Sequence, residues 1–433
     1  MMISNLFNRL DRSTCSFLAA DTIINVLKNN NFVQLKPEED WEIKPGGKYY
    51  LEKNSSAVFA IVLGEKNDNG YKIISAHTDS PCFKLKPNPE IIGDGGVITL
   101  NVEKYGGGIL YTWFDRPLSM SGRLLLKDKD PLYPREVLFD LEKPVATIPH
   151  LAIHFNREVN EGNRLSVQKD MKPVLGYFSQ EEIMDSIPYG GMVRKMICDN
   201  LGISPDLILD MEVILYPCFK ATKVGYSENL YQSGRIDDLS MAFAGLEALT
   251  GICDDPSDSI RVLAVFDNEE TGSATKQGAA SPVLANILSR IERALGRNED
   301  SHLKNIEKGF MISADCAHAW HPNYSERHDP TNHPVIGGGP VIKINANGKY
   351  MTDAYGSAVF QNICKEAGVE YQFFVNHSDI AGGSTLGNIS TSQMDLKGVD
   401  VGAAMWAMHS AVETAGISDY IDFVKIFKKF WTL

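Results

Sequence analysis

The chain has 433 residues and a formal net charge of −13, from 42 basic and 55 acidic side chains. A nucleic acid or an anionic membrane surface would require a basic face, so this balance argues against both as partners. Seven cysteines without a CxxC pair predict reduced thiols in a cytoplasmic protein rather than a disulfide framework. No apolar run approaches the roughly 18 residues of a membrane span, and the first residues lack the apolar core of a secretory signal.

Apolar residues recur at helical spacing near the amino-terminal end and predict one amphipathic helix over residues 4–29, interrupted near Ser13. Short strand-like runs follow at residues 48–52, 57–63 and 71–76. Between 90 and 228 the chain becomes rich in Gly, Pro and alternating apolar residues, which predicts β-hairpins. We therefore expect a separate, mostly-β domain inserted into the first one.

From about residue 230 the pattern returns to strands that alternate with helices, which predicts an α/β fold with a mostly parallel sheet and helices on both faces. The expected division is an α/β domain formed by residues 1–89 and 229–433 around the inserted β-rich domain at 90–228. Four helices are expected in this part of the chain. One follows Asp237-Asp238, one spans 282–295, one ends at Gly368, and a short one follows His409.

Ionisable residues stand at or beside the ends of several apolar runs, where an open α/β sheet forms its sites. They are His77, Asp237, Glu269, Glu270, Asp315 and His409. Zinc accepts imidazole nitrogen and carboxylate oxygen, and two-metal hydrolases bridge their ions with a shared carboxylate. Such a pair of sites needs about two histidines and three carboxylates, with a further carboxylate as general base, and these residues supply that set.

Asp79 lies two residues after His77, so on an extended backbone both side chains share a face, and Asp79 can orient the imidazole. Each residue alone also has an ordinary structural explanation. Asp237 or Asp238 can cap a helix, the glutamate pair can form a solvated turn, and His409 can be a satisfied core histidine. The coincidence of several such residues at strand ends favours a site.

Several segments resemble the M18 family of metallo-aminopeptidases, the aspartyl aminopeptidase group, in the same order over essentially the whole chain. They are HTDSPCFKLKP, GRIDDL, FDNEETGS, ISADCAHAWHPNY, GPVIKIN and AMHS. The resemblance implies a phosphopeptidase-like α/β catalytic domain with a central mixed, mostly parallel sheet and an inserted β-rich dimerisation domain. It also implies a homo-oligomer, in which dimers assemble into a tetrahedral dodecamer.

The resemblance further implies two zinc ions per subunit, for which cobalt or manganese can substitute. The implied ligands are His77, Asp237 and Asp315 for one ion, and Asp237, Glu270 and His409 for the other. Glu269 matches the family's catalytic carboxylate. Substrate contacts are matched by His154, which would reach a neighbouring subunit's site, and by His318, Lys343 and Tyr350. Asp238 departs from the family, which usually has asparagine there, and adds a negative charge beside the metals.

These features predict an exopeptidase that removes the first residue of peptides. A lysine in the pocket for the first side chain would pair with aspartate or glutamate, so Lys343 predicts peptide substrates with an acidic first residue. An M18 aminopeptidase of neutral, hydrophobic or broad preference is the alternative. A non-catalytic shell or cargo-binding protein of the same fold is a further hypothesis, which missing ligands would favour, and none is missing.

Overall fold

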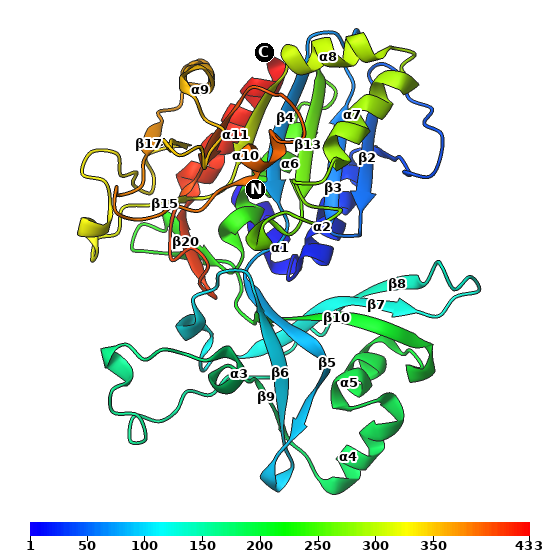
Figure 1. Ribbon diagram of the computed structural model, residues 1–433, viewed down its shortest axis with the longest axis vertical. Coiled ribbons are helices and arrows are strands. Elements are labelled where there is room, and N and C mark those ends of the chain that lie inside the picture. The colour runs from blue at the N-terminus through cyan, green and yellow to red at the C-terminus, as the bar shows by residue number, and fades with distance from the viewer. The chain divides into compact units, whose positions relative to one another are not determined.

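A computed structural model describes every residue from Met1 to Leu433 (Figure 1). The chain forms two compact units. The first unit consists of Met1–Asp79, Ala221–Met408 and Glu413–Leu433, and the second of Ser80–Lys220 and His409–Val412. The second unit begins at Ser80, before the boundary expected at residue 90, because strand β5 (Cys82–Ile92) pairs with β6 (Val97–Tyr105) of the same unit.

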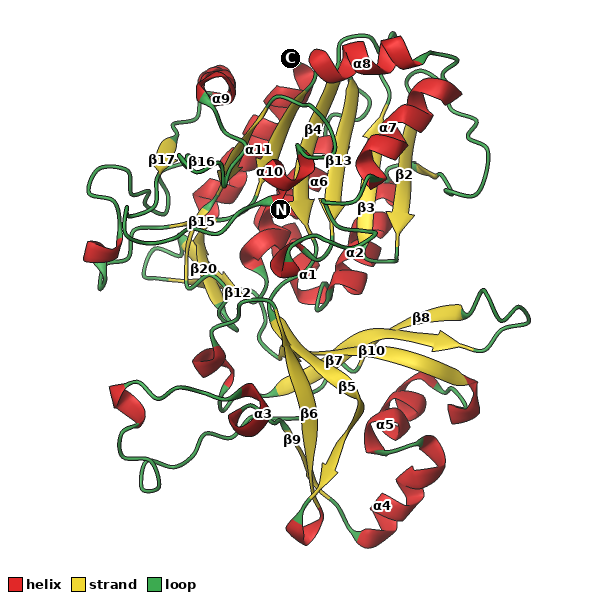
Figure 2. Cartoon of the chain, in the orientation of Figure 1, coloured by secondary structure: helices red, strands yellow, loops and turns green.

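A nine-stranded sheet forms the centre of the first unit (Figure 2). In spatial order its strands are β1 (Val33–Gln34), β2 (Lys48–Lys53), β3 (Ala57–Val62), β13 (Ile260–Phe266), β4 (Tyr71–His77), β14 (Phe310–Ala314), β18 (Gly398–Gly402), β16 (Val341–Lys343) and β17 (Gln372–Phe374). The neighbours β13, β4, β14 and β18 run parallel, whereas β3 and β16 pair antiparallel with them. The predicted mixed, mostly parallel sheet is therefore confirmed.

Helices cover both faces of this sheet because its inner strands are apolar on both sides. The helices of this unit are α1 (Met2–Arg12), α2 (Ser16–Asn29), α6 (Ile236–Thr250), α7 (Val283–Ala294), α8 (Glu299–Glu307), α9 (Ala354–Ala367), α10 (Leu386–Ser390) and α11 (Ile417–Thr432). In β3, Val58 and Ala60 join one hydrophobic cluster with helices α1, α2, α6 and α11, whereas Phe59 and Ile61 join a second cluster with α7.

The predicted helices of the first unit are present, but the last one is longer than expected, and α8 and α10 were not predicted. The amino-terminal helix is interrupted as expected, since α1 ends at Arg12 and α2 begins at Ser16. The short helix expected after His409 is wrong, because α11 runs for 16 residues and buries Phe423 and Phe427 in the core. Helix α8 was not predicted, because its sequence EDSHLKNIE has a weak apolar pattern.

A smaller five-stranded sheet also belongs to the first unit. Its strands, in spatial order, are β11 (Thr222–Val224), β12 (Leu230–Ser233), β20 (Glu413–Gly416), β19 (Ala404–Trp406) and β15 (Ala317–His318). Strand β20 leads directly into α11, and Glu413 within it accepts a hydrogen bond from the backbone N–H of Asp237 at 3.1 Å. This sheet therefore helps to fix the start of α6.

The second unit is built on a six-stranded antiparallel sheet. Its strands, in spatial order, are β8 (Arg135–Asp140), β7 (Leu118–Leu126), β10 (Ile208–Pro217), β5, β6 and β9 (Val174–Tyr177). The sheet agrees with the expected β-rich pattern, but the unit also contains α3 (Val167–Asp170), α4 (Gln180–Ser186) and α5 (Met192–Leu201). No helix of the chain combines the length and the apolar character needed to cross a membrane.

Candidate metal centre

Three neighbouring parallel strands bring ionisable residues to one edge of the central sheet. His77 is the last residue of β4, Glu269 follows the end of β13, and Asp315 follows β14 directly. Because parallel strands end at the same edge, their following residues meet there although they are far apart in sequence. This is the placement that the strand-end pattern predicts.

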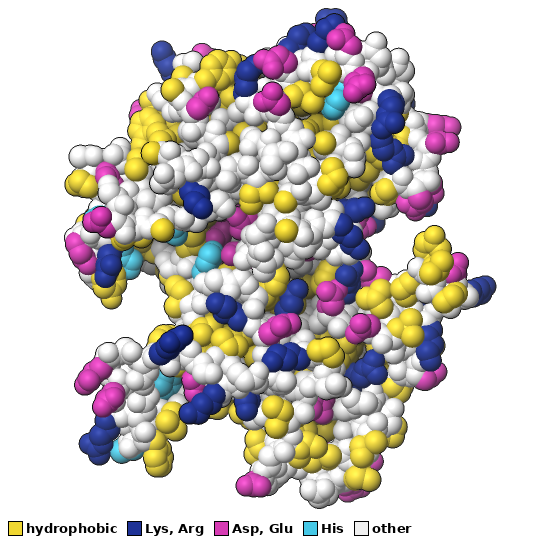
Figure 3. Space-filling model, viewed as in Figure 1, with side chains coloured by type: hydrophobic (Ala, Val, Ile, Leu, Met, Phe, Trp, Pro, Cys, Tyr) yellow, Lys and Arg dark blue, Asp and Glu magenta, His cyan; other side chains and the backbone are white.

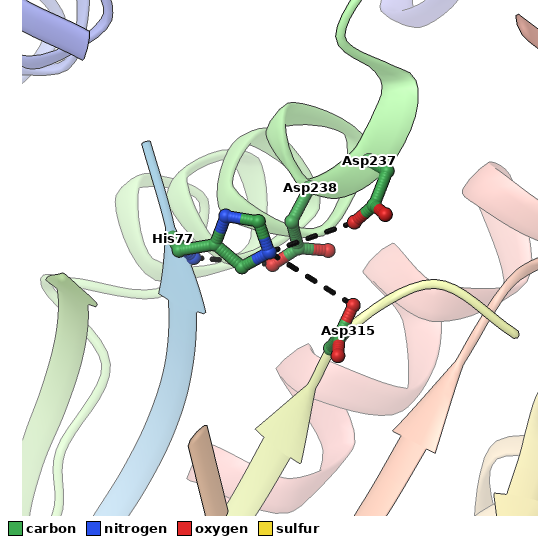
Figure 4. A group of neighbouring side chains, drawn as sticks. All are labelled: His77, Asp237, Asp238 and Asp315. Atoms are coloured by element: carbon green, nitrogen blue, oxygen red, sulfur yellow. Dashed lines mark hydrogen bonds and ion pairs between the residues drawn. The ribbon is translucent and has the colours of Figure 1, made fainter. Parts of the chain in front are cut away.

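Four side chains, with His77 and Asp315 among them, form a buried cluster, shown in Figure 4. His77 comes from β4, Asp237 and Asp238 come from the first turn of α6, and Asp315 comes from the end of β14. One potential ligand atom from each lies within 4.8 Å of the others. The imidazole Nε2 of His77 is 3.5 Å from Asp237 Oδ1 and 3.9 Å from Asp315 Oδ1.

The other nitrogen of the His77 ring is held by Asp79, mainly through the backbone. Nδ1 lies 3.0 Å from the Asp79 carbonyl oxygen and 3.4 Å from its carboxylate. The Asp79 carboxylate instead accepts the backbone N–H groups of Glu269 and Glu270, each at 3.1 Å. When Nδ1–H donates to the carbonyl, Nε2 presents its lone pair to the cluster, which is the tautomer that a metal requires.

Carboxylates in the cluster and beside it resist ionisation. Burial and, to a smaller extent, nearby acids raise the pKa of Asp315 to about 6 and that of Glu269 to about 8, against the opposing effect of neighbouring cationic groups. Burial and neighbouring carboxylates also raise the pKa of Asp238 well above its ordinary range. Burial alone would lower the pKa of His77, but hydrogen bonds to Asp237 and Asp79 raise it. A cation among these groups would reverse the shifts of the acids.

The donor set therefore fits a divalent metal ion. Asp238 Oδ2 accepts the backbone N–H of His77 at 3.1 Å, while its buried Oδ1 has no hydrogen-bond partner. A buried carboxylate oxygen without a hydrogen-bond partner destabilises the folded state, and a bound cation would provide the missing partner. Imidazole nitrogen together with carboxylate oxygen is also a combination that zinc accepts.

Glu269 and Glu270 form a second group with His77, again with potential ligand atoms within 4.8 Å. Both glutamates are half-buried in the short 3₁₀ helix η6 (Glu269–Thr271). The segment after them is folded back onto Asn268, whose Oδ1 accepts hydrogen bonds from Thr275 at 2.9 Å and from Gln277 at 2.7 Å. The pair is thus placed at the cluster and is not a freely solvated turn.

Lys343 extends the charge network of the cluster. It ends β16, its side chain is only 4% exposed, and its Nζ lies 3.4 Å from Asp315 Oδ2. Burial alone would lower the pKa of Lys343, but Asp315 raises it, so the amine stays charged. Tyr350 is buried beside it, with the Nζ 5.7 Å from the ring centroid. Lys343 thus faces Asp315 in this structure, a partner that its sequence did not indicate.

Of the remaining predicted residues, His318 belongs to the first unit, whereas His154 and His409 belong to the second. His318 is exposed on β15 and packs edge-on against Phe374 at 5.9 Å. His154 is exposed in a loop of the second unit. His409 begins the segment His409–Val412 of the same unit, where its carbonyl accepts the N–H of Ile109 at 2.9 Å. The roles of His154 and His409 stay predictions.

Asp238 is the member of the cluster that the sequence did not assign as a ligand. It was considered as a helix cap or as an added charge, yet its carboxylate binds the His77 backbone and belongs to the buried group. The available signal was an acidic residue directly after Asp237, at the turn where α6 begins.

Three comparisons place the chain among known proteins. The sequence profile of the family described as aminopeptidase I zinc metalloprotease (M18) matches residues 9–431. A probable M18 family aminopeptidase 2 of Clostridium novyi (strain NT) is 43% identical over 432 residues, which cover 99% of this chain and 98% of that protein.

The fold is also similar to solved structures. A chain from the cryo-EM structure of the Ape4 and Nbr1 complex has a TM-score of 0.93 and 32% identity, with 99% of this chain and 85% of that chain covered. A chain from the S. cerevisiae mApe1 dodecamer has a TM-score of 0.86 and 25% identity, with 99% and 96% covered.

Proposed function

The chain belongs to the M18 family of zinc aminopeptidases, and from this premise we propose that it is a two-zinc exopeptidase that removes an acidic first residue from peptides. Family membership makes the protein a metallo-aminopeptidase, and therefore a hydrolase. The observation that carries the proposed metal centre is the orientation of His77, whose Nε2 faces the buried carboxylates of Asp237 and Asp315.

We assign one ion to His77, Asp237 and Asp315, with the Asp238 carboxylate beside them. The second ion would be held by Asp237, Glu270 and His409, so that Asp237 would serve both sites. Bound zinc supplies a Lewis acid that polarises the peptide carbonyl and acidifies water. Cobalt and manganese accept nitrogen and oxygen ligands as well, which supports their substitution.

Glu269 is the proposed general base. Its backbone is fixed by the Asp79 carboxylate, and its side chain lies at the cluster with His77. It takes the proton from the attacking water and delivers it to the nitrogen of the leaving amine. His154 from a second copy of the chain is proposed to stabilise the developing oxyanion, which would make assembly a condition for full activity.

The acidic preference rests on Lys343, a buried cation at the edge of the cluster, with Tyr350 and His318 as further proposed substrate contacts. A substrate carboxylate would form a charge-assisted hydrogen bond with this amine. The alternative, an aminopeptidase of neutral or broad preference, is favoured by one observation. Lys343 already has a partner in Asp315 at 3.4 Å, and that ion pair leaves less charge for a substrate.

Measurement of kcat/KM for a panel of peptides with the Lys343→Met variant separates these two preferences. The acidic preference predicts that kcat/KM falls roughly 10- to 100-fold for Asp- and Glu-initiated peptides, the equivalent of one charged hydrogen bond, with little change for Leu-initiated peptides. Lys349→Met, at an exposed lysine nearby, is the matched control. An equal fall for all peptides would assign Lys343 to the support of Asp315 and would favour the alternative.

We also propose that the chain forms a homo-oligomer, built from dimers into a tetrahedral dodecamer. The support is the similarity of fold to the mApe1 chain, which was solved as a dodecamer. Light scattering of the purified protein tests this directly, and a stable monomer with full activity would exclude both the assembly and a shared role for His154.

A further inference from the structure

A cavity of about 460 Å³ lies in the first unit, between strands β2 and β3 and helix α7. Its interior is largely apolar, and the main contributors are Trp41, Leu51, Phe59, Val283 and Ile287. None of the proposed metal or substrate residues lines it. Its volume falls within the range of small-molecule sites, roughly 300–1,000 Å³, and the apolar lining is typical of them.

The rim of this cavity is basic. It carries four cations, Lys53, Lys276, Arg290 and Arg293, against a single acidic residue, Glu52. In Figure 3, Lys and Arg side chains gather on the flank where Figure 1 places α7. A net positive rim of this kind contrasts with the net charge of −13 for the whole chain. The charged side chains that line the cavity are therefore net positive and favour an anion among them, although the protein as a whole repels anions.

Arg290 is structural, whereas Lys276 and Arg293 are exposed and Lys53 is half-buried. The guanidinium of Arg290 stacks on the ring of Trp41 at 3.8 Å and donates to the carbonyls of Pro37 at 2.6 Å and Glu39 at 2.8 Å. These contacts hold the wall of the cavity in place. Arg293 makes only a 3.4 Å hydrogen bond along its own helix, and Lys276 is exposed.

We propose that this cavity binds a small amphipathic carboxylate, whose apolar body fills the interior and whose carboxylate meets Lys53, Lys276 and Arg293 at the rim. Burial of the body supplies most of the affinity, at about 25 cal/mol per Å² of apolar surface. The rim cations select the sign of the head group. A neutral or cationic molecule of the same shape gains the free energy of apolar burial but not the attraction of the rim cations.

Part of the cavity wall is formed by the segment that follows the metal centre in the sequence. Lys276, Ser281 and Pro282 line the cavity, and the segment that contains them follows Glu269 and Glu270 along the chain. Within this segment, Gln277 is bound to Asn268 beside the glutamates. Occupation of the cavity is therefore expected to protect the backbone amides of residues 271–287 from hydrogen exchange.

Calorimetric titration with 4-phenylbutyrate, compared with 4-phenylbutylamine, tests the proposal on the full-length, metal-loaded protein. The carboxylate is expected to bind at least about tenfold more tightly than the amine, a difference of about 1.4 kcal/mol. The charge reversals Lys53→Glu and Arg293→Glu should each weaken the carboxylate by a similar factor. Lys365→Glu, at an exposed position of α9, is the control and should leave the affinity unchanged.

Three results would overturn the proposal. The first is equal binding of carboxylate and amine, and the second is an affinity that neither charge reversal alters. The third is hydrogen-exchange protection confined to the metal centre, together with competitive inhibition of peptide cleavage, which would place the carboxylate there. Lys276→Glu changes an exposed side chain, so it keeps the test valid should either of the other variants fold poorly.

Discussion

Among single side chains, Glu269 has the environment expected of a general base. Burial raises its pKa, Asp315 and Glu270 contribute in the same direction, and His77 opposes them, which together places the pKa at about 8. A metal ion in the cluster would lower the pKa again, towards the range in which a carboxylate can accept a proton at neutral pH. The backbone N–H of Glu269 donates a hydrogen bond to the Asp79 carboxylate, which fixes the position of the backbone that carries this side chain.

Glu269→Gln is expected to reduce kcat by roughly 10² to 10⁴, because general acid–base catalysis contributes that much, while the zinc content stays unchanged. Steady-state kinetics and metal analysis on the same sample measure both effects. Glu38→Gln, at an exposed position, is the control. A variant with full activity would remove the assignment, and loss of zinc would make Glu269 a ligand instead.

Asp238→Asn tests the extra carboxylate of this chain. The amide oxygen can still accept the His77 N–H, so the fold is kept, but one buried charge next to the metal is lost. We expect zinc to bind roughly tenfold more weakly, by analogy with residues that support metal ligands, and the chelated protein to become more stable at neutral pH. Competition with a zinc chelator and thermal unfolding measure these two effects. Unchanged affinity would show that Asp238 acts only through its hydrogen bond.

At the scale of elements, the segment between η6 and α7 links the glutamate pair to the rest of the fold. Asn268 adopts φ 63°, and its side chain accepts hydrogen bonds from Thr275 and Gln277. Asn268→Gly keeps the left-handed backbone accessible but removes the acceptor. We expect a loss of about 1–3 kcal/mol in stability, because the buried amide of Gln277 is left without a partner, and a lower kcat/KM.

Asn31→Gly is a matched control, because Asn31 also has a positive φ of 61° and lies outside the metal centre. Chemical denaturation and peptide kinetics on both variants separate the two contributions. If Asn268→Gly and Asn31→Gly lose stability equally and keep full activity, the hydrogen bonds of Asn268 do not position the glutamates.

The elements that the sequence predicted well are those whose own residues reveal burial. Strand β3 is apolar at every position because both of its faces are covered, and this reads directly as a buried strand. Helix α8 has a single buried position, Asn305, which donates to Glu292 at 2.7 Å, so its pattern contains almost no signal. Helix α11 is longer than expected, although its buried aromatic residues Tyr420, Phe423, Phe427 and Phe430 recur three or four residues apart, which is the spacing of one helix face.

At the scale of the whole molecule, the sequence could indicate the ligand types but not all of their neighbours. His77 and Asp315 end adjacent strands of the sheet, so the strand-end rule brought them together. The pairing of Lys343 with Asp315 depends on the sheet order β14-β18-β16, which local patterns do not contain. The order of the strands in the sheet therefore decides which charged side chains face one another.

The raised pKa values predict how the stability of the chelated protein depends on pH. Burial raises the pKa of Asp315 to about 6 and that of Glu269 to about 8, so the folded state holds these protons more tightly than the unfolded state. Their contribution is therefore present at acidic pH and is lost as the pH rises from about 4 to about 8. Zinc should restore stability most strongly at the upper end, because it binds the ionised groups.

Thermal unfolding with a chelator and with zinc, measured across this pH range, tests that dependence. We expect the two unfolding temperatures to diverge as the pH rises. Parallel curves would mean that these carboxylates do not face a metal ion.

The most direct test of the central claim is a calorimetric zinc titration of the chelated protein with peptide hydrolysis measured on the same samples. The proposed metal centre predicts two equivalents of zinc per chain and the return of activity with metal, and it predicts that His77→Ala loses the ion assigned to His77, Asp237 and Asp315. Hydrolysis that persists in the chelated protein, or a His77→Ala variant that binds zinc as the unmodified chain does, would contradict it.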